Sequence, residues 1–283
     1  MKTTVFFLIC SLILTTMNGF AQKEVKGNGN LLTKEIQVSN YKRLSLSGNI
    51  RGKKNTGQNI KGILVYNQEL PIFNYMQKTG NSFLQITTDE NLFPLLDIQF
   101  TDSCLYIQTD NSLQLLPTEF TVNSSSAELD KVEIMKNVNF YLRSSLSSEN
   151  LRIRVSGAAD AYLNQPIQIQ NTCAIKVSGA GNLRINDLNC QNIQVNISGA
   201  GDLKLKGSAQ TGEYKASGSG DISAYDFVVA DLKCRVSGSG DIKAYATNSI
   251  DANASGSGDI KYRGNPQVIK RVVSQAANIK HRQ

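Results

Sequence analysis

A short phrase that returns six times between residues 151 and 261 constrains the fold of this chain more than any other feature. The copies read SGAAD, SGAGN, SGAGD and then SGSGD three times, and their starts lie 22, 20, 19, 20 and 18 residues apart. A period near 20 residues is typical of stacked units, none of which can bury its own apolar face alone. The sequence therefore predicts a repeat architecture.

Apolar residues stand at every second position on both sides of each phrase. With the phrase serine as position zero, they occupy −5, −3, −1, +5 and +7, as in Ile193, Val195, Ile197, Leu203 and Leu205 around Ser198. The positions between them are mostly polar and include Arg152, Arg154, Lys176, Arg184, Lys204, Lys206, Lys215 and Lys243. Alternation with period two is typical of strands, whose successive side chains point to opposite faces.

These patterns together predict an all-β parallel β-helix with one coil of about 20 residues per copy. We expect each unit to be two short strands joined by the glycine-rich corner. Equivalent residues then stack about 4.8 Å apart, and each inward position becomes a ladder of apolar side chains in one core. The glycines at +1 and +3 are expected to give the corner a positive φ, which glycine adopts without steric cost.

Position +4 carries Asp or Asn in every copy, as Asp160, Asn182, Asp202, Asp221, Asp241 and Asp259. Carboxylates stacked about 4.8 Å apart repel by roughly 1 kcal/mol in water, so something should compensate. One interpretation is that each side chain accepts backbone N–H groups of its own turn. The other is a bound cation, for which Asp202, Asp221, Asp241 and Asp259 are candidate Ca²⁺ ligands. We find no catalytic residues and expect no other cofactor.

The serial SG[AS]G[DN][IL] phrase, followed by IKYRGNP at residues 260–266, resembles the head GIN domain family. That family is described as putative auto-transporter adhesins of Bacteroidetes-type bacteria. The resemblance covers residue 36 to the C-terminus and includes the strand-rich segments 92–109 and 132–142. It implies a parallel β-helix in an envelope protein, and it offers no established activity and no catalytic residues to transfer.

Residues 1–21 are typical of a secretory signal peptide, with Lys2 before the apolar run 5–14 and small residues before Gln22. This run is too short to span a bilayer, and no later segment is long and apolar enough to do so. We therefore expect export to the periplasm, the outer-membrane surface or the exterior. Export removes the usual nucleic-acid target, and no recognition motif for nucleic acid appears.

The remaining chain is expected to form one body. Residues 22–35 are predicted to be a flexible leader, 36–150 irregular β coils that cover one end, and 151–283 the regular coils. Asn123–Ser126 is predicted to be a loop. The aromatic residues Phe73, Tyr75 and Phe93 either form a binding patch or pack in the core.

Four cysteines remain after the predicted signal peptide, at positions 104, 173, 190 and 234. An exported protein permits disulfides. However, Cys173 and Cys234 fall on inward columns three coils apart, about 14 Å at the strand spacing, which exceeds disulfide reach. We expect them to act as small apolar core residues. Zinc is disfavoured, because no CxxC motif occurs and the sole histidine is His281.

The formal net charge of +7 comes from Lys2 and six basic residues in the acid-free segment 261–283, since the other 23 basic residues balance 23 acidic ones. Within that segment, Ser274 begins a degenerate seventh copy of the phrase, 19 residues after Ser255 and with Asn278 at +4. Its glycines are missing and Arg271 takes an inward position. Terminal repeats are expected to be more polar, so residues 268–279 are predicted to be an ordered capping coil.

Two classes of function fit these observations. The first is a non-enzymatic adhesion, binding or structural module that presents a repetitive surface to a glycan or protein. The second is a carbohydrate-active enzyme on a β-helix scaffold, which needs two positioned carboxylates in a cleft. The acids here form one regular column, whereas an active site breaks a repeat locally, so the first class is favoured. The oligomeric state is left open.

Overall fold

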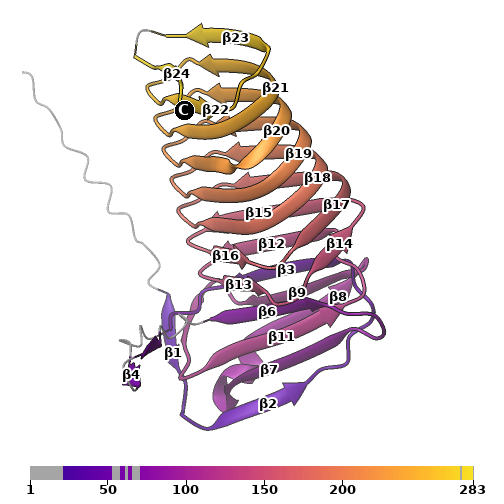
Figure 1. Ribbon diagram of the computed structural model, residues 1–283. Helices are drawn as coiled ribbons and strands as arrows, with labels where there is room; N and C mark the ends of the chain where they lie inside the picture. Colours follow the sequence, from indigo (N-terminus) through magenta and orange to yellow (C-terminus); the bar gives the residue numbers. More distant parts are fainter. Residues whose placement is uncertain (1–21, 53–57, 61–62, 66–70, 275, 283) are drawn as a thin grey trace, which may run out of the picture.

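The computed structural model describes residues 22–52, 58–60, 63–65, 71–274 and 276–282, and the predicted signal peptide lies outside these ranges. The chain winds into a tall stack of strands, with the C-terminal coils at one end and the N-terminal strands at the other (Figure 1). A parallel β-solenoid of about 7 turns, with a step of about 20 residues, confirms the predicted fold class. In the described part of the chain, no helix is long and apolar enough to cross a membrane.

Ten strands build the regular part of the stack. They are β15 (Leu151–Gly157), β16 (Asp160–Leu163), β17 (Ile167–Val177), β18 (Leu183–Ile197), β19 (Leu203–Ala216), β20 (Ile222–Val236), β21 (Ile242–Ala254), β22 (Ile260–Arg263), β23 (Val268–Val273) and β24 (Ile279–His281). Each coil pairs in parallel with the next, and equivalent positions stand in register, so that Tyr214 lies between Val195 of the preceding coil and Cys234 of the following one.

In the middle of the stack, the strand that follows one corner and the strand that precedes the next, expected to be two short strands, form one long bent strand. β18, for example, begins after one glycine corner and ends before the next. The register with β19 shifts between Ile185 and Leu188, which marks the bend. A β-strand can therefore pass from one side of the solenoid to the next without ending. An irregular residue bends the strand, while its hydrogen bonds to the neighbouring coil continue before and after the bend.

The inward columns agree with the alternation in the sequence. Every side chain assigned to positions −5, −3, −1, +5 and +7 of the six copies is at most 3 % exposed. Cys173 and Cys234 are among them, and the four cysteines of the described residues are free thiols. Burial raises the pKa of the half-buried Cys190 thiol to about 11. The structure confirms Cys173 and Cys234 as small apolar core residues.

The expected reason for the corner glycines is wrong. Among the six phrases, only Gly157 has a positive φ, at +79°. The other corners lie directly on one another: the Gly220 N–H donates to the Gly199 carbonyl at 3.1 Å, and a Cβ on Gly220 would overlap the Gly201 carbonyl oxygen. Close approach of stacked backbone, rather than backbone conformation, therefore requires glycine at these corners.

The N-terminal part contains the remaining elements. They are β1 (Lys23–Lys26), β2 (Leu31–Glu35), β3 (Arg43–Gly48), β4 (Gln58–Ile60), β5 (Ile63–Val65), β6 (Ile72–Gln77), β7 (Phe83–Asp89), the 3₁₀ helix η1 (Glu90–Leu95), β8 (Leu96–Thr101), β9 (Cys104–Thr109), β10 (Leu113–Leu116), β11 (Phe120–Ser126), β12 (Lys131–Lys136), β13 (Asn139–Leu142) and β14 (Leu146–Ser148). Parallel pairing continues from β15 to β12, β3 and β9.

Antiparallel strands distinguish this part from the irregular coils that the sequence predicts. β7 pairs antiparallel with β11 and β2, and β8 pairs antiparallel with β9. The β8–β9 hairpin turns at Asp102 and Ser103, whose φ angles of 48° and 58° suit a tight turn between right-twisted strands. The β8–β9 pair therefore needs only a short connection, whereas β7 pairs with strands from distant segments of the chain.

Two further expectations are resolved in this part. Phe73, Tyr75 and Phe93 are buried, so they pack in the core and form no surface patch. Asn123–Ser126, predicted to be a loop, belongs to β11. Its polar character is compatible with burial because the Ser126 hydroxyl lies 2.9 Å from the Tyr75 hydroxyl and donates to the Glu128 carbonyl at 2.7 Å.

The degenerate seventh copy forms the ordered final coil that the sequence predicts. β23 pairs with β21, and β24 pairs with β22. Arg271 lies 5.4 Å from the Tyr262 ring centroid and donates to its hydroxyl, so its guanidinium covers an aromatic of the preceding coil. Ile269 and Val273, on inward positions of this coil, are 45 % and 52 % exposed because no further coil covers them.

Removal of residues 267–283 is expected to make the protein oligomerise. The deletion uncovers Ile250, Ile260 and Tyr262, which are now at most 1 % exposed, and it frees the edge of β21 for pairing with another chain. Light scattering measures the mass and calorimetry the melting temperature, with Lys280→Ala as a surface control. A truncated protein that stays monomeric with an unchanged melting temperature would refute the capping role.

Candidate functional site

The aspartate column links each coil to the next. The Oδ1 atoms of Asp160, Asp202, Asp221, Asp241 and Asp259 each accept the backbone N–H of the following +4 residue at 2.7–3.0 Å. Asn182 does the same for Asp202 at 3.3 Å. The expected acceptance of backbone N–H groups is present, but the donor belongs to the next coil rather than to the same turn. The N–H dipoles between the carboxylates offset part of their mutual repulsion.

Lys261 strengthens the C-terminal end of the column. Its Nζ lies 2.7 Å from Oδ2 of Asp241 and 3.4 Å from Oδ2 of Asp259. The hydrogen bond to Asp241 raises the pKa of Lys261, and hydrogen bonds from Asn278 and then Lys261 lower the pKa of Asp259. A carboxylate with a lowered pKa stabilises the fold above its ordinary pKa, and that contribution is lost as the pH falls through the folded value.

Calcium at Asp202, Asp221, Asp241 and Asp259 stays a prediction. One oxygen of each carboxylate is already bound to a backbone N–H. Across the part of the chain that the structure describes, no group of three or more His, Cys, Asp or Glu side chains is arranged to hold a metal ion. A Ca²⁺ ion takes six to eight oxygen ligands. A column with one carboxylate per coil can supply only a few of these ligands.

Asp221→Ala is expected to lower stability by roughly 1–3 kcal/mol, because it leaves the Asp241 N–H without its charged acceptor. Asp221→Asn is the matched control and should retain most of the stability, since Asn182 already accepts such a bond in the column. Calorimetric melting in EDTA and in excess Ca²⁺ should give the same transition. A large rise with Ca²⁺ that disappears when Asp202, Asp221, Asp241 and Asp259 are all changed to Asn would overturn this structural role.

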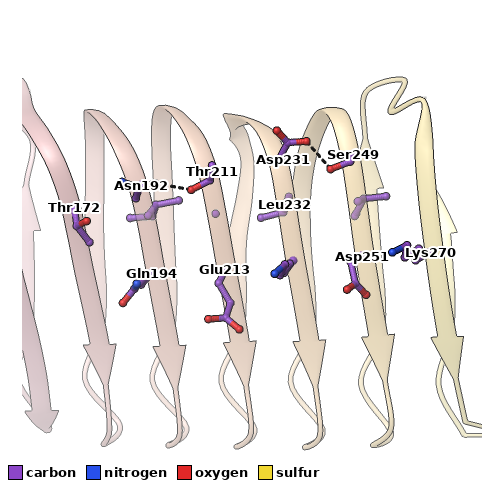
Figure 2. A pocket seen from close by; sticks show the side chains of 14 residues that line it. Thr172, Asn192, Gln194, Thr211, Glu213, Asp231, Leu232, Ser249, Asp251 and Lys270 are labelled. Carbon is purple, nitrogen blue, oxygen red and sulfur yellow. Dashed lines mark hydrogen bonds between the residues drawn. The ribbon is translucent and has the colours of Figure 1, made fainter.

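A groove crosses the outward face of the strands that precede the corners. It has a volume of about 730 Å³, extends from Thr172 on β17 to Lys270 on β23, and is lined by side chains in rows that cross the strands (Figure 2). One row holds Thr172, Asn192, Thr211, Asp231 and Ser249, and the other holds Gln194, Glu213, Lys233, Asp251 and Lys270.

Hydrogen bonds along the first row hold its side chains in place. The Thr211 hydroxyl donates to the Asn192 amide oxygen at 2.7 Å, and the Ser249 hydroxyl donates to the Asp231 carboxylate at 2.6 Å (Figure 2). A second hollow, of about 760 Å³, shares Thr172 and Gln194 with the groove and continues it toward Lys42 and Arg43. The outward face thus carries one long depression over successive coils.

This groove was not among the sites predicted from the sequence. The prediction that the polar residues between the apolar ones point outward is correct, but it did not compare these outward positions from one coil to the next. The signal that could have found the groove is the count from each phrase serine, since position −6 is Thr172, Asn192, Thr211, Asp231 or Ser249. These are short polar residues, which leave space above the sheet.

Solved structures share this architecture. A putative adhesin from Parabacteroides merdae is 26 % identical with a TM-score of 0.79, and the alignment covers 92 % of this chain and 100 % of that one. A putative lipid binding protein from Parabacteroides distasonis is also 26 % identical over the same shares, with a TM-score of 0.81. A putative adhesin from P. distasonis is 28 % identical over the same shares, with a TM-score of 0.72. None of the curated proteins matches this chain.

The family resemblance is confirmed by a direct match. Residues 73–266, more than half of the chain, match the family described as "Putative auto-transporter adhesin, head GIN domain". This match includes the six phrases, the aspartate column and nearly all of the groove. The chain therefore belongs to the head GIN domain family of putative auto-transporter adhesins.

Proposed function

We propose that this protein is a non-enzymatic adhesion module of the cell envelope that presents its grooved outward face to a glycan or a protein. The observation that carries the proposal is the depression that continues over the outward face from β3 to β23. A rigid, repetitive face suits an extended ligand, because equivalent contacts return at each coil about 4.8 Å apart. The adhesin description of the family and of two solved relatives supports the same class of function.

A carbohydrate-active enzyme is less well supported by the acids of this groove. Glu213 forms an ion pair with Lys215 at 2.9 Å, Asp231 accepts the Ser249 hydroxyl, and Asp251 lies 3.9 Å from Arg235. Each carboxylate thus has a partner on its own or the adjacent strand. A glycosidase needs one carboxyl group held as an acid and a second placed as a base or nucleophile across the scissile bond.

The proposed location is the exported side of the cell envelope. Its support is the signal peptide expected at residues 1–21, together with the adhesin description of the family. Fractionation of cells that produce the full chain, followed by protease treatment of intact cells, tests this location. Protein that stays in the cytosolic fraction would contradict it.

A binding screen tests the proposed function. The purified protein is applied to an array of glycans and extracellular proteins, with and without Ca²⁺, and the products of any bound polysaccharide are analysed. We expect saturable binding to a defined ligand class without cleavage. The heat-unfolded protein is the control for non-specific adsorption. Binding to none of the probes, or release of shortened glycan products, would argue against a non-enzymatic adhesion module.

A further inference from the structure

One end of the outward face carries a cluster of cations. We call it the basic face and define it by Arg43, Lys131, Arg152, Arg154 and Lys176. Arg43, Lys131 and Arg152 are register partners on β3, β12 and β15. Arg154 and Lys176 are register partners on β15 and β17 in the neighbouring row. Parallel pairing therefore brings together residues that lie in distant segments of the chain.

Three of these cations have no counterion in the described part of the chain. Lys131 forms an ion pair with Glu133 at 3.0 Å, and Arg43 donates to the Asp102 carbonyl. Arg152, Arg154 and Lys176 are exposed and form no ion pair with any described residue. Like charges side by side on neighbouring strands repel, so a bound anion would relieve an unfavourable arrangement.

The basic face surrounds a hollow. Ala174 stands between Arg152 and Gln194 in the row of register partners, and its methyl group leaves space where the neighbours have long side chains. A depression of about 390 Å³ extends from Lys131 over Ala174 to Lys176 and Asn196. The amides of Gln194 and Asn196 lie beside the cations, so the hollow offers neutral hydrogen-bonding groups as well as positive charge.

These features favour an acidic carbohydrate over an anionic membrane. The large apolar side chains that are exposed lie on other strands: Leu31, Met76, Phe100, Val228, Ile269, Val272 and Val273. A surface that binds lipid by insertion needs apolar side chains beside its cations, and β3, β12, β15 and β17 present none of these. An extended glycan, by contrast, has anionic groups for arginine and lysine and hydroxyl groups for amides.

We propose that the basic face binds a linear anionic polysaccharide, with carboxylate or sulfate groups on Arg152, Arg154 and Lys176 and sugar hydroxyl groups on Gln194 and Asn196. This inference rests on the proposed adhesion function and names its ligand class. The polysaccharide lies along the solenoid axis, so that successive sugars meet successive coils. Two acidic residues line the hollow, Glu133, which is the register partner of Arg154, and Glu213. Both already form ion pairs, Glu133 with Lys131 and Glu213 with Lys215.

A charge-reversal variant tests the proposal. Binding of the full chain to polygalacturonate, dextran sulfate, neutral dextran and phosphatidylglycerol vesicles is measured by calorimetry or interferometry. The combined change Arg152→Glu, Arg154→Glu and Lys176→Glu is expected to weaken binding to the two anionic polysaccharides by about tenfold or more. The matched variant Lys78→Glu, Lys204→Glu and Lys243→Glu alters the net charge equally but lies on other surfaces, and its affinity should stay within about twofold of the original.

The outcomes separate this inference from the proposed function. Binding to both anionic polymers but not to neutral dextran or vesicles, lost only in the first variant, supports the basic face. Equal losses in both variants would show a general charge effect and overturn the inference, as would binding to vesicles alone. If both variants bound neutral glycans equally well, the inference about the basic face would be overturned, and the proposed adhesion function would still hold. Circular dichroism melting of each variant shows that a lost affinity is not a lost fold.

Discussion

Leu203→Asp or Ile242→Asp is expected to unfold the protein. Both side chains are fully buried in the ladder at position +5, where Leu203 has Leu183 and Ile222 as register partners. A carboxylate at either position loses its hydration and finds no cation inside the core, which costs several kcal/mol. Total stabilities of 5–15 kcal/mol are usual for domains. We expect the cooperative transition in circular dichroism melting to disappear.

The matched controls are outward residues on the same strands. Lys204→Asp and Lys243→Asp should change stability by less than about 0.5 kcal/mol, because neither side chain is buried. Leu203→Ala gives a graded intermediate, with an expected loss of about 2–5 kcal/mol that urea titration can quantify. Outward changes that proved more damaging than inward ones would contradict the register described above.

The regular half of the fold could be predicted because its information is local. Period-two alternation decides which face each side chain takes, and the constant phrase aligns one coil with the next. Leu203 and Lys204 could therefore be assigned to opposite faces from neighbouring positions alone. The terminal coil was recognised in the same way, since Ser274 and Asn278 keep their places relative to Ser255.

The N-terminal half depends on pairings that no phrase marks. β11 pairs in parallel with β6 and antiparallel with β7, and both partners lie more than 30 residues before it. Its serines resemble a loop in sequence, yet Ser126 is buried because Tyr75 supplies a hydrogen-bond partner from β6. Such partners belong to the tertiary structure, so composition alone predicted the wrong local state.

The candidate binding surface was hidden for a related reason. The sequence places Arg152, Arg154 and Lys176 outward, but Lys131 and Arg43 join them only through the pairing of β15 with β12 and of β12 with β3. The basic face crosses the boundary between the irregular and regular parts. A count of charges along the chain instead drew attention to the basic segment 261–283, where Lys261 serves the aspartate column and Arg271 covers Tyr262.

Gly220→Ala is expected to destabilise the protein by roughly 2–4 kcal/mol, although Ala is the smallest side chain that can replace glycine. Its Cβ would overlap the carbonyl oxygen of Gly201 in the preceding coil. Relief requires the two coils to move apart, which weakens the bonds from the Ser219 and Gly220 N–H groups to the Gly199 carbonyl, now 3.0 and 3.1 Å long. Thermal and urea unfolding measure the loss.

Three controls separate close approach from backbone conformation. Ser219→Ala, at the exposed tip of the same corner, should be nearly neutral. Gly80→Ala, at φ +101° with open space around it, should show only the cost of a positive φ, about 1 kcal/mol. Gly220→Asn is the decisive comparison, because asparagine tolerates positive φ but not a steric overlap. It should therefore be at least as damaging as Gly220→Ala, and near-normal stability of the asparagine variant would show that conformation, not the stacking of coils, selects glycine at this corner.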